Sequence, residues 1–398
     1  MEDLPDTIVA LRDTVRQFAR NRLAPLVPEL DAEGHNATDA VNELIKRGCE
    51  IGLFSGFLPR KYGGTITGLA AAVAMEELAA VDSGIATFFG SVGLGLTPIA
   101  LSGDRRLFER YFPEVAEGEH QGKPVLWAFS ITEPEAGSDV EDTEGSRVAR
   151  LGTIAVREGD EYVLNGRKVF CSLGNLAKYI SVFACVGERS IDTWTCFVVP
   201  TSTPGFSIGR VERKLGQRAC PAAELVFDNV RIPVENRVGE EGQGWDLNRQ
   251  TLAVSRPTVG AIGLGIARAA YDHALAYAMT RHQGGKKIVE HQLTQYKLAR
   301  IAMQIEMVRD LVHRASAHRP ASLKLSSMAK VAGSDLAVAA TSEAIQIYGG
   351  YGYMQDAPVE KLYRDAKITQ IYEGTNEMNL LAAMEAILDE RNFRRTGS

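Results

Sequence analysis

The stretch EYVLNGRKVF, residues 161–170, decides the fold class, because it is strand-like in a chain that has helical patterns on either side. Its two arms flank Asn165–Gly166, a pair that suits the tight primed turn of a β-hairpin, so a hairpin is predicted there. Three more β-rich runs follow between glycines and prolines: YISVFACVG (179–187), TWTCFVVP (193–200) and AELVFDNVRIP (223–233). A β-domain is therefore expected in the middle of the chain.

Helical periodicity dominates outside this region. Residues 1–121 carry helical patterns between breakers, and from Gly244 to Arg391 the helical period returns. Apolar residues at spacings of three and four predict one buried face of a long helix: Leu298, Ile301, Ile305, Val308 and Val312. Because helices, strands and helices follow one another without β-α-β alternation, the expected fold is mainly α with a central β-domain. The predicted domains are residues 1–121, 122–236 and 237–398.

Composition excludes several classes of function. The 398 residues carry a formal charge of −6, which argues against a nucleic-acid partner. The five cysteines lack a C-x-x-C pair and the seven histidines lack a metal-binding motif, so we expect reduced thiols and no metal. The N-terminus does not look like a signal peptide, and we expect no stretch long enough to span a membrane. These features predict a cytoplasmic protein.

Three segments are candidates for chemistry: FSITEPEAGSDV (129–140), TRHQGGKKI (280–288), and IQIYGGYGYM (345–354) followed by TQIYEGTNEMN (369–379). Each also has a plain structural interpretation, respectively a solvated β-turn, a loop between helices, and a helix C-cap with its turn. The glycine-rich GLGIARAA (263–270) lacks a preceding strand, which argues against a Rossmann dinucleotide site.

Taken together, these motifs resemble the acyl-CoA dehydrogenase family of FAD-dependent enzymes, and the resemblance covers essentially the whole chain. It rests on TEPEAGSDV, NGRKVFCS, PVENRVGEEGQGW, RHQGGKKIVEHQ and YGGYGYMQDAPVEKLYRDAKITQIYEGTNEM in that order. The resemblance implies an N-terminal helical domain, a β-barrel-like middle domain and a C-terminal four-helix bundle. It also implies α,β-desaturation of an acyl-CoA, electron transfer flavoprotein as the acceptor, and a homotetramer.

The resemblance implies a set of FAD-binding residues. The first group would line the flavin and the thioester: Phe129, Ile131, Thr132, Gly137 and Ser138 on one strand and turn, and Phe170, Cys171 and Ser172 on the adjoining strand. The second group would contact the FAD of a neighbouring subunit: Arg281, Gln283, His291, Gln292, Gln346, Gly349 and Gly350. Thr375 and Glu377 would also contact the cofactor.

Glu373 matches the catalytic base of the family. Burial can raise a carboxyl pKa by up to about 3–5 units, whereas a helix N-terminus lowers it by less, so a dry site would make Glu373 basic. Some relatives carry the base immediately before Arg256, where this chain has Ser255, which cannot serve. Ser138, Arg256, Tyr372 and Gly374 are the expected substrate-binding residues: Arg256 near CoA, Tyr372 as a shield against water, and Gly374 as a passage for the acyl chain.

The chain departs from the usual pattern in places. Gly284 stands where an aromatic is usual, Ala253 where an acid is usual, and the segments near 115–125 and 141–146 look longer. The nature of the acyl chain is left open by the sequence. Two alternatives also stay open: a flavin oxidase, monooxygenase or thioester lyase on the same scaffold, and a non-catalytic FAD-stabilised binding protein.

Overall fold

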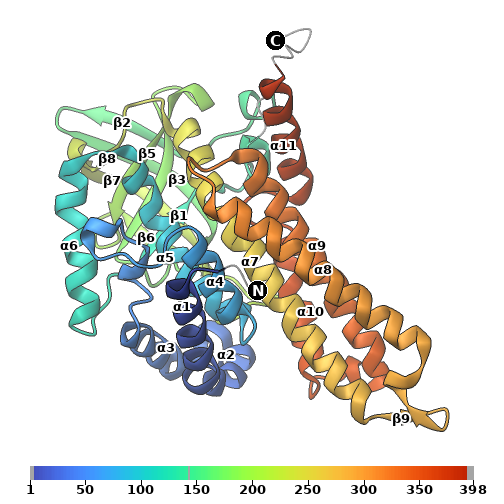
Figure 1. Ribbon diagram of the computed structural model, residues 1–398. Coiled ribbons are helices and arrows are strands. Elements are labelled where there is room, and N and C mark those ends of the chain that lie inside the picture. The colour runs from blue at the N-terminus through green and yellow to red at the C-terminus, as the bar shows by residue number, and fades with distance from the viewer. Residues whose placement is uncertain (1–3, 142–143, 392–398) are drawn as a thin grey trace.

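The computed structural model describes residues 4–141 and 144–391, and it consists of a helical part, a β-sheet and a second helical part in that order along the chain (Figure 1). The first part contains α1 (Asp6–Phe18), α2 (Val27–Glu33), α3 (Thr38–Glu50), α4 (Leu69–Ala79), α5 (Ser83–Ser102) and α6 (Arg105–His120). The expected fold class is confirmed.

Helix α5 corrects one expectation from the sequence. This 20-residue helix is long and apolar enough to cross a membrane by length and composition, with a mean hydropathy of 1.6 over its best window. Of that window, 72% is buried inside the protein, as in the core helix of a globular domain. The expectation that no stretch reaches this length was therefore wrong, and burial accounts for the apolar composition of α5.

Eight strands in the described part of the chain form one sheet: β1 (Trp127–Ser130), β2 (Ile154–Glu158), β3 (Glu161–Ser172), β4 (Tyr179–Val186), β5 (Trp194–Pro200), β6 (Phe206–Val211), β7 (Ala222–Pro233) and β8 (Arg237–Val238). Their order is β6-β7-β3-β2-β4-β5-β8, and β1 pairs with β4 in parallel. Strand β8 extends the sheet two residues beyond the expected boundary at 236.

The predicted hairpin around Asn165–Gly166 is wrong, because β3 runs through this pair as one strand of 12 residues. At Gly166 the pairing of β3 with β7 shifts its register, which is the signature of a β-bulge. A Cβ on Gly166 would lie 2.6 Å from the Cα of Thr153, so only glycine fits. The true turn joins β2 to β3 at Gly159–Asp160, where Gly159 has a φ of +64°.

The second helical part begins with the 37-residue α7 (Gly244–Thr280), followed by α8 (Gln292–Ala317), α9 (Leu323–Tyr348), α10 (Pro358–Thr369) and α11 (Asn376–Glu390). The predicted apolar face of α8 is confirmed, because Leu298, Ile301, Ile305 and Val312 are buried and Val308 packs against the same core. Helices α7, α8 and α9 lie alongside one another, and the small hairpin of β9 (His282–Gln283) and β10 (Lys286–Lys287) caps their far end (Figure 1).

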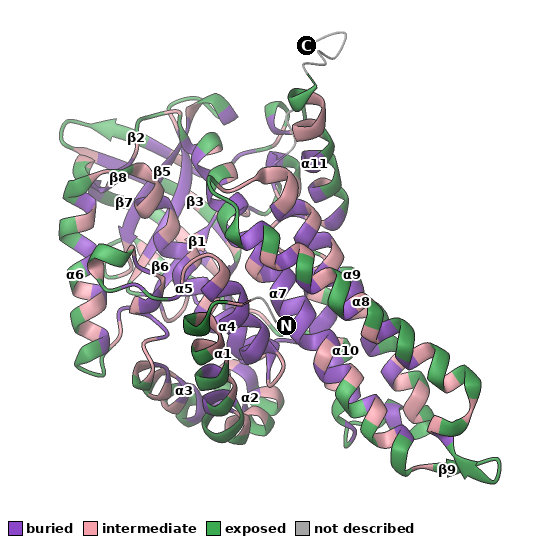
Figure 2. Cartoon of the chain, viewed as in Figure 1, coloured by how far each residue is buried: buried purple, intermediate pink, exposed green. Residues whose placement is uncertain are grey.

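Buried ion pairs join the two helical parts. Glu76 and Glu77, which interrupt the apolar run of α4, are buried and bind arginines of α7 and α8. The carboxylate of Glu77 receives two hydrogen bonds of 2.7 Å from Arg268, and Arg16 of α1 donates to it at 2.8 and 2.9 Å. Helix α4 packs against α7 at this junction, and both ribbons are coloured mainly as buried there (Figure 2).

Candidate active site

The candidate base lies on a turn between α10 and α11. Glu373 and Gly374 both have left-handed backbone conformations, with φ of +53° and +84°. Such a conformation costs a non-glycine residue free energy and persists where the surroundings impose it. Thr375 then caps α11 by accepting a hydrogen bond of 3.4 Å from the Met378 amide.

Hydrogen bonds from four directions hold this turn. Arg256 Nε of α7 donates to the Glu373 carbonyl at 3.1 Å, and Lys330 Nζ of α9 donates to the Gly374 carbonyl at 2.8 Å. Asn379 Nδ2 reaches the Gly374 carbonyl at 2.8 Å, and the Thr375 amide donates to Ser138 Oγ at 3.2 Å. The turn is therefore bound to α7, α9 and α11 of the second helical part and to the middle domain.

The carboxyl group of Glu373 is surrounded by protein atoms, although the residue as a whole keeps some exposed surface. Burial raises the pKa of Glu373 to about 7, against the opposing effects of Ser255, Arg256 and Lys330. Ser255 Oγ donates a hydrogen bond of 2.5 Å to Glu373 Oε2. A carboxylate with a pKa near neutrality suits proton abstraction at physiological pH.

Lys330 is a second group near the turn with a strongly shifted pKa. It is fully buried, and burial is the main reason that its pKa falls to about 7. Besides the Gly374 carbonyl, its ammonium group binds Asn376 Oδ1 at 2.7 Å. The Lys330 side chain thus places its amino group in hydrogen-bond contact with the backbone of the turn.

The prediction that Arg256 contacts CoA is not supported by its geometry. Arg256 is 2% exposed, and its guanidinium pairs with Glu141 while donating to Ser327 Oγ at 3.2 Å and to the Glu373 carbonyl. Because all three guanidinium nitrogens are engaged inside the protein, Arg256 cannot reach a ligand at the surface. Its contacts are with the turn that carries the candidate base.

Gly374 also differs from its expected role. A Cβ on this residue would lie 2.5 Å from Glu141 Oε2 and 3.0 Å from Arg256 Nη2, so its open side is filled by the ion pair and is not a passage for an acyl chain. Tyr372 fits its expected role better, because its hydroxyl is buried and has no hydrogen-bond partner within the described residues. Burial raises the pKa of this hydroxyl.

A chamber of about 690 Å³ opens beside the base between α4, α5 and α7. Ser255, which binds the Glu373 carboxylate, is part of its wall. Much of the lining consists of small residues, namely Ala71, Gly90, Gly93, Ala253, Ala315 and Ala321. A cavity of this size and largely apolar character fits a small-molecule substituent.

The expected flavin wall lies at the end of β1 and on the adjoining β3. Phe129, Ile131, Thr132, Gly137, Ser138 and Ser172 are partly exposed there, as a ligand-binding wall requires. Phe170 has a φ of +59° and is 63% exposed, so its ring projects from the sheet. Cys171 is the exception, because its buried thiol lies 3.4 Å from the Phe129 carbonyl and leaves only its backbone for a ligand.

A buried ion pair fixes the end of β1. Lys168 of β3 is fully buried, and its ammonium group binds Glu133 Oε1 at 2.7 Å and the Ile131 carbonyl at 2.9 Å. The other carboxylate oxygen of Glu133, Oε2, accepts hydrogen bonds from the amides of Gly152 and Thr153. This network therefore sets the position of residues 131–133 against β3.

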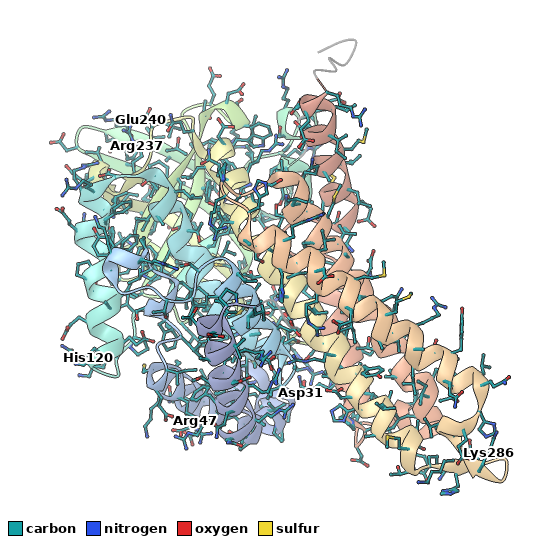
Figure 3. All side chains as sticks on the ribbon, viewed as in Figure 1. Asp31, Arg47, His120, Arg237, Glu240 and Lys286 are labelled. Carbon is teal, nitrogen blue, oxygen red and sulfur yellow. The ribbon has the colours of Figure 1, made fainter. Side chains whose placement is uncertain are left out.

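The second group of expected cofactor residues lies at the end of the bundle that carries β9, away from α11 (Figure 1). Arg281, Gln283, Gln346, Gly349 and Gly350 line one cavity of about 650 Å³. His291 Nε2 lies 3.0 Å from the Gln283 carbonyl, and Gln292 is exposed at the start of α8. Figure 3 shows Lys286 at this tip, so the structure separates the two groups within one copy of the chain.

Sequence analysis missed three residues around the turn. Glu141 was assigned to a loop, although it is buried beside Gly374; residues 142–143 of that loop lie outside the described residues. The sequence pattern excludes Ser255 as a base without indicating its contact with Glu373, and it does not single out Lys330. A single lysine among small residues in SSMAKVAGSD, 326–335, was the available signal for Lys330. Glu377, in contrast, is exposed, and its pKa is lowered by hydrogen bonds from its own backbone amide and from the Thr375 side chain.

Three family models match successive parts of the chain: the N-terminal domain (residues 5–119), middle domain (128–230) and C-terminal domain (242–388) of acyl-CoA dehydrogenases. Cyclohexane-1-carbonyl-CoA dehydrogenase of Geobacter metallireducens is 37% identical over 395 residues, covering 98% of this chain and 100% of that protein. No group of three metal-ligating side chains lies within the described ranges.

Solved structures agree with this result. Butyryl-CoA dehydrogenase from Megasphaera elsdenii superposes with a TM-score of 0.88 at 36% identity, covering 98% of this chain and 100% of that one. A structure described as the electron transferring flavoprotein of Acidaminococcus fermentans gives 0.87 at 34% identity, with 98% and 99% covered. The similarity extends over all three domains, and this chain belongs to the acyl-CoA dehydrogenase family of oxidoreductases.

Proposed function

We propose that this protein is an acyl-CoA dehydrogenase that removes hydrogen from Cα and Cβ of a CoA thioester, with Glu373 as the base for the α-proton. One observation carries the proposal: a buried carboxyl with its pKa raised to about 7 stands on a fixed turn beside a largely apolar chamber. Proton abstraction next to a thioester needs a base that is placed accurately and is unusually basic.

FAD is the cofactor of this family, and the residues of the chain fit it. The projecting ring of Phe170 and the partly exposed end of β1 form a wall for a flat ring system. In the second cavity, a Cβ on Gly349 or Gly350 would meet nothing within 4 Å, so a pyrophosphate can approach the backbone beside Arg281. When bound, FAD supplies the acceptor for the hydride that leaves Cβ.

The residues of the chain accept the proton and provide the hydrogen bonds and the dry environment that this step needs. The Glu373 carboxylate receives the α-proton, while the backbone N–H of Glu373 is the proposed donor to the thioester carbonyl. Ser255 orients the carboxylate through its 2.5 Å hydrogen bond. Tyr372, whose hydroxyl is buried, is proposed to exclude water and so to keep the desolvation that makes Glu373 basic.

The acyl group is proposed to be compact and broad, such as a cyclohexane-1-carbonyl group. The small residues around the chamber, including Gly90, Gly93 and Ala253, leave space for a broad acyl group beside α5 and α7. The named relative from Geobacter metallireducens, whose own substrate is alicyclic by its name, supports this choice. A short straight chain such as butyryl is the natural comparison, given the similarity to butyryl-CoA dehydrogenase.

A homo-oligomer is part of the proposal, because one copy separates the two cofactor groups. An exposed apolar stripe on α8, formed by Leu293, Tyr296, Met303 and Met307, supports contact with another copy. The family implies four copies and electron transfer flavoprotein as the electron acceptor, and the second structural relative supports the latter.

The test is anaerobic mixing of the FAD-loaded protein with a panel of acyl-CoAs while the visible flavin band is followed. Bleaching by cyclohexane-1-carbonyl-CoA is expected, and Glu373→Gln should retain FAD and ligand binding but lose about 10²–10⁴-fold or more in bleaching rate. Undiminished bleaching by the variant would refute the role of Glu373. Rapid reoxidation of the bleached flavin by O₂ would favour the oxidase alternative.

A further inference from the structure

Glu141 brings a carboxylate from the middle domain to the turn that carries the base. It ends the short helix Ser138–Glu141, is 6% exposed, and forms a buried ion pair with Arg256. Its Oε2 atom lies 2.5 Å from the position that a Cβ on Gly374 would take. Glu141 thus packs against the turn at Gly374 and pairs with Arg256.

Arg256 connects this ion pair to the backbone carbonyl of Glu373. Its Nη2 pairs with Glu141, its Nη1 donates to Ser327 Oγ at 3.2 Å, and its Nε donates to the Glu373 carbonyl at 3.1 Å. A guanidinium is planar and rigid, so fixing two of its nitrogens fixes the third. The position of the Glu373 carbonyl is therefore coupled to Glu141.

We propose that Glu141 is a positioning residue that acts through Arg256, holding the guanidinium under the Glu373 carbonyl and balancing its charge beside the base. The inference rests on the proposed function of Glu373. A buried charge left without its partner is strongly destabilising, so Arg256 without Glu141 would move toward other acceptors or disturb the turn.

The charges around Glu373 also support a role for Glu141. Ser255 and Arg256 face it from α7, Lys330 from α9 and Glu141 from the middle domain; Tyr372 precedes it on the same turn. The two cations and the serine lower the pKa of Glu373, whereas Glu141 raises it. Removing the negative charge of Glu141 would leave the cations unopposed and make the base weaker.

The experiment compares the wild type with Glu141→Gln as FAD-loaded proteins. The rate of anaerobic flavin bleaching is measured against pH, and the acid limb should move down by about one pH unit, as expected for an unbalanced cation near a carboxylate. The plateau rate should fall by roughly 10- to 100-fold, because the base is weaker and less well placed. Amide hydrogen exchange across residues 372–379 should become faster.

Two further proteins separate position from charge. Glu77→Gln removes a carboxylate that is equally buried and paired with arginines, but it lies away from the turn, so neither the acid limb nor exchange at 372–379 should change. The double variant Glu141→Gln/Arg256→Met removes both charges. Its acid limb should return close to the wild-type position, while exchange across the turn stays fast.

An unchanged acid limb, or unchanged exchange at 372–379, in folded Glu141→Gln would overturn the inference. Failure of the proposed function is distinguishable from this outcome. If no acyl-CoA bleaches the wild-type flavin, the dehydrogenase proposal fails, whereas the exchange comparison still decides whether Glu141 holds the turn.

Discussion

Ser255 Oγ lies 2.5 Å from Glu373 Oε2 and donates a hydrogen bond to it. Ser255, which cannot itself act as the base, therefore binds the carboxylate of Glu373, which we propose as the base. This hydrogen bond stabilises the ionised carboxylate and lowers its pKa, in opposition to the effect of burial.

The variant Ser255→Ala should raise the pKa of Glu373 above its value of about 7, because the hydrogen bond to the ionised form is lost. A base must be ionised to act, so the acid limb of the bleaching rate should move to higher pH. Thr251→Ala is the control, since Thr251 is buried on the same helix and its hydroxyl donates to the Leu247 carbonyl. A limb that moves equally in both variants would contradict the role of Ser255.

Glu373→Gln should be more stable than the wild type above pH 7. The pKa of Glu373 is higher in the folded state, about 7, than in the unfolded chain, about 4.5. The folded state therefore binds the extra proton between these pH values, and wild-type stability from this group is lost as the pH rises through them. Gln removes this loss, so the gain in melting temperature should grow from pH 4.5 to 7 and then level off.

Circular dichroism melts at pH 4.5, 6, 7 and 8 would measure this gain. Glu306→Gln is the control, because the side chain of Glu306 is 65% exposed. A constant difference between the wild type and Glu373→Gln at every pH would show that the carboxyl is not desolvated.

Lys168→Met should loosen the flavin wall. The variant leaves Glu133 as a buried charge without its cation and removes the bond to the Ile131 carbonyl, which costs about 3–5 kcal/mol for a buried pair. We expect a lower melting temperature and weaker FAD retention in gel filtration. Lys178→Met, which breaks the exposed pair with Glu114, should cost only about 0–1 kcal/mol and retain FAD. Equal FAD retention in both variants would contradict this role.

Gly90→Val should narrow the chamber. A Cβ at position 90 would lie 3.5 Å from Met75 Sδ, an ordinary contact, so larger side chains fit at the cost of chamber volume. We expect kcat/KM for cyclohexane-1-carbonyl-CoA to fall by roughly 10- to 200-fold, with a smaller loss for butyryl-CoA. Gly90→Ala should be intermediate, and equal losses for both substrates would argue that this chamber does not hold the acyl group.

The fold was largely predictable from the sequence, because periodicity reports burial. The apolar spacing in α8 and the change from helical to strand-like residues near 122 needed no knowledge of partners. The hairpin at Asn165–Gly166 failed because the same pair suits both a turn and a bulge, and the choice depends on the close approach of Thr153. Local sequence carries no information about that approach.

The site was predictable where a motif carries it and unpredictable where contacts join distant segments. The motif is enough to propose Glu373 as the base, but Glu141, Arg256 and Lys330 are separated from it by between 43 and 232 positions in the sequence. Their roles come from three elements that meet only in the folded protein. Arg256 was placed near CoA because its burial could not be deduced from a helical pattern that is apolar on most sides.

The distance between Arg281 and the base turn has a genetic consequence. In the proposed assembly, which holds each cofactor between neighbouring copies, a chain carrying Glu373→Gln and a chain carrying Arg281→Glu would each lack a different part of the site. When both chains are produced in one cell, some mixed assemblies would contain a cofactor site that combines the intact Glu373 of one chain with the intact Arg281 of the other. Two alleles that are inactive alone would then complement each other, and activity would appear only in cells that carry both.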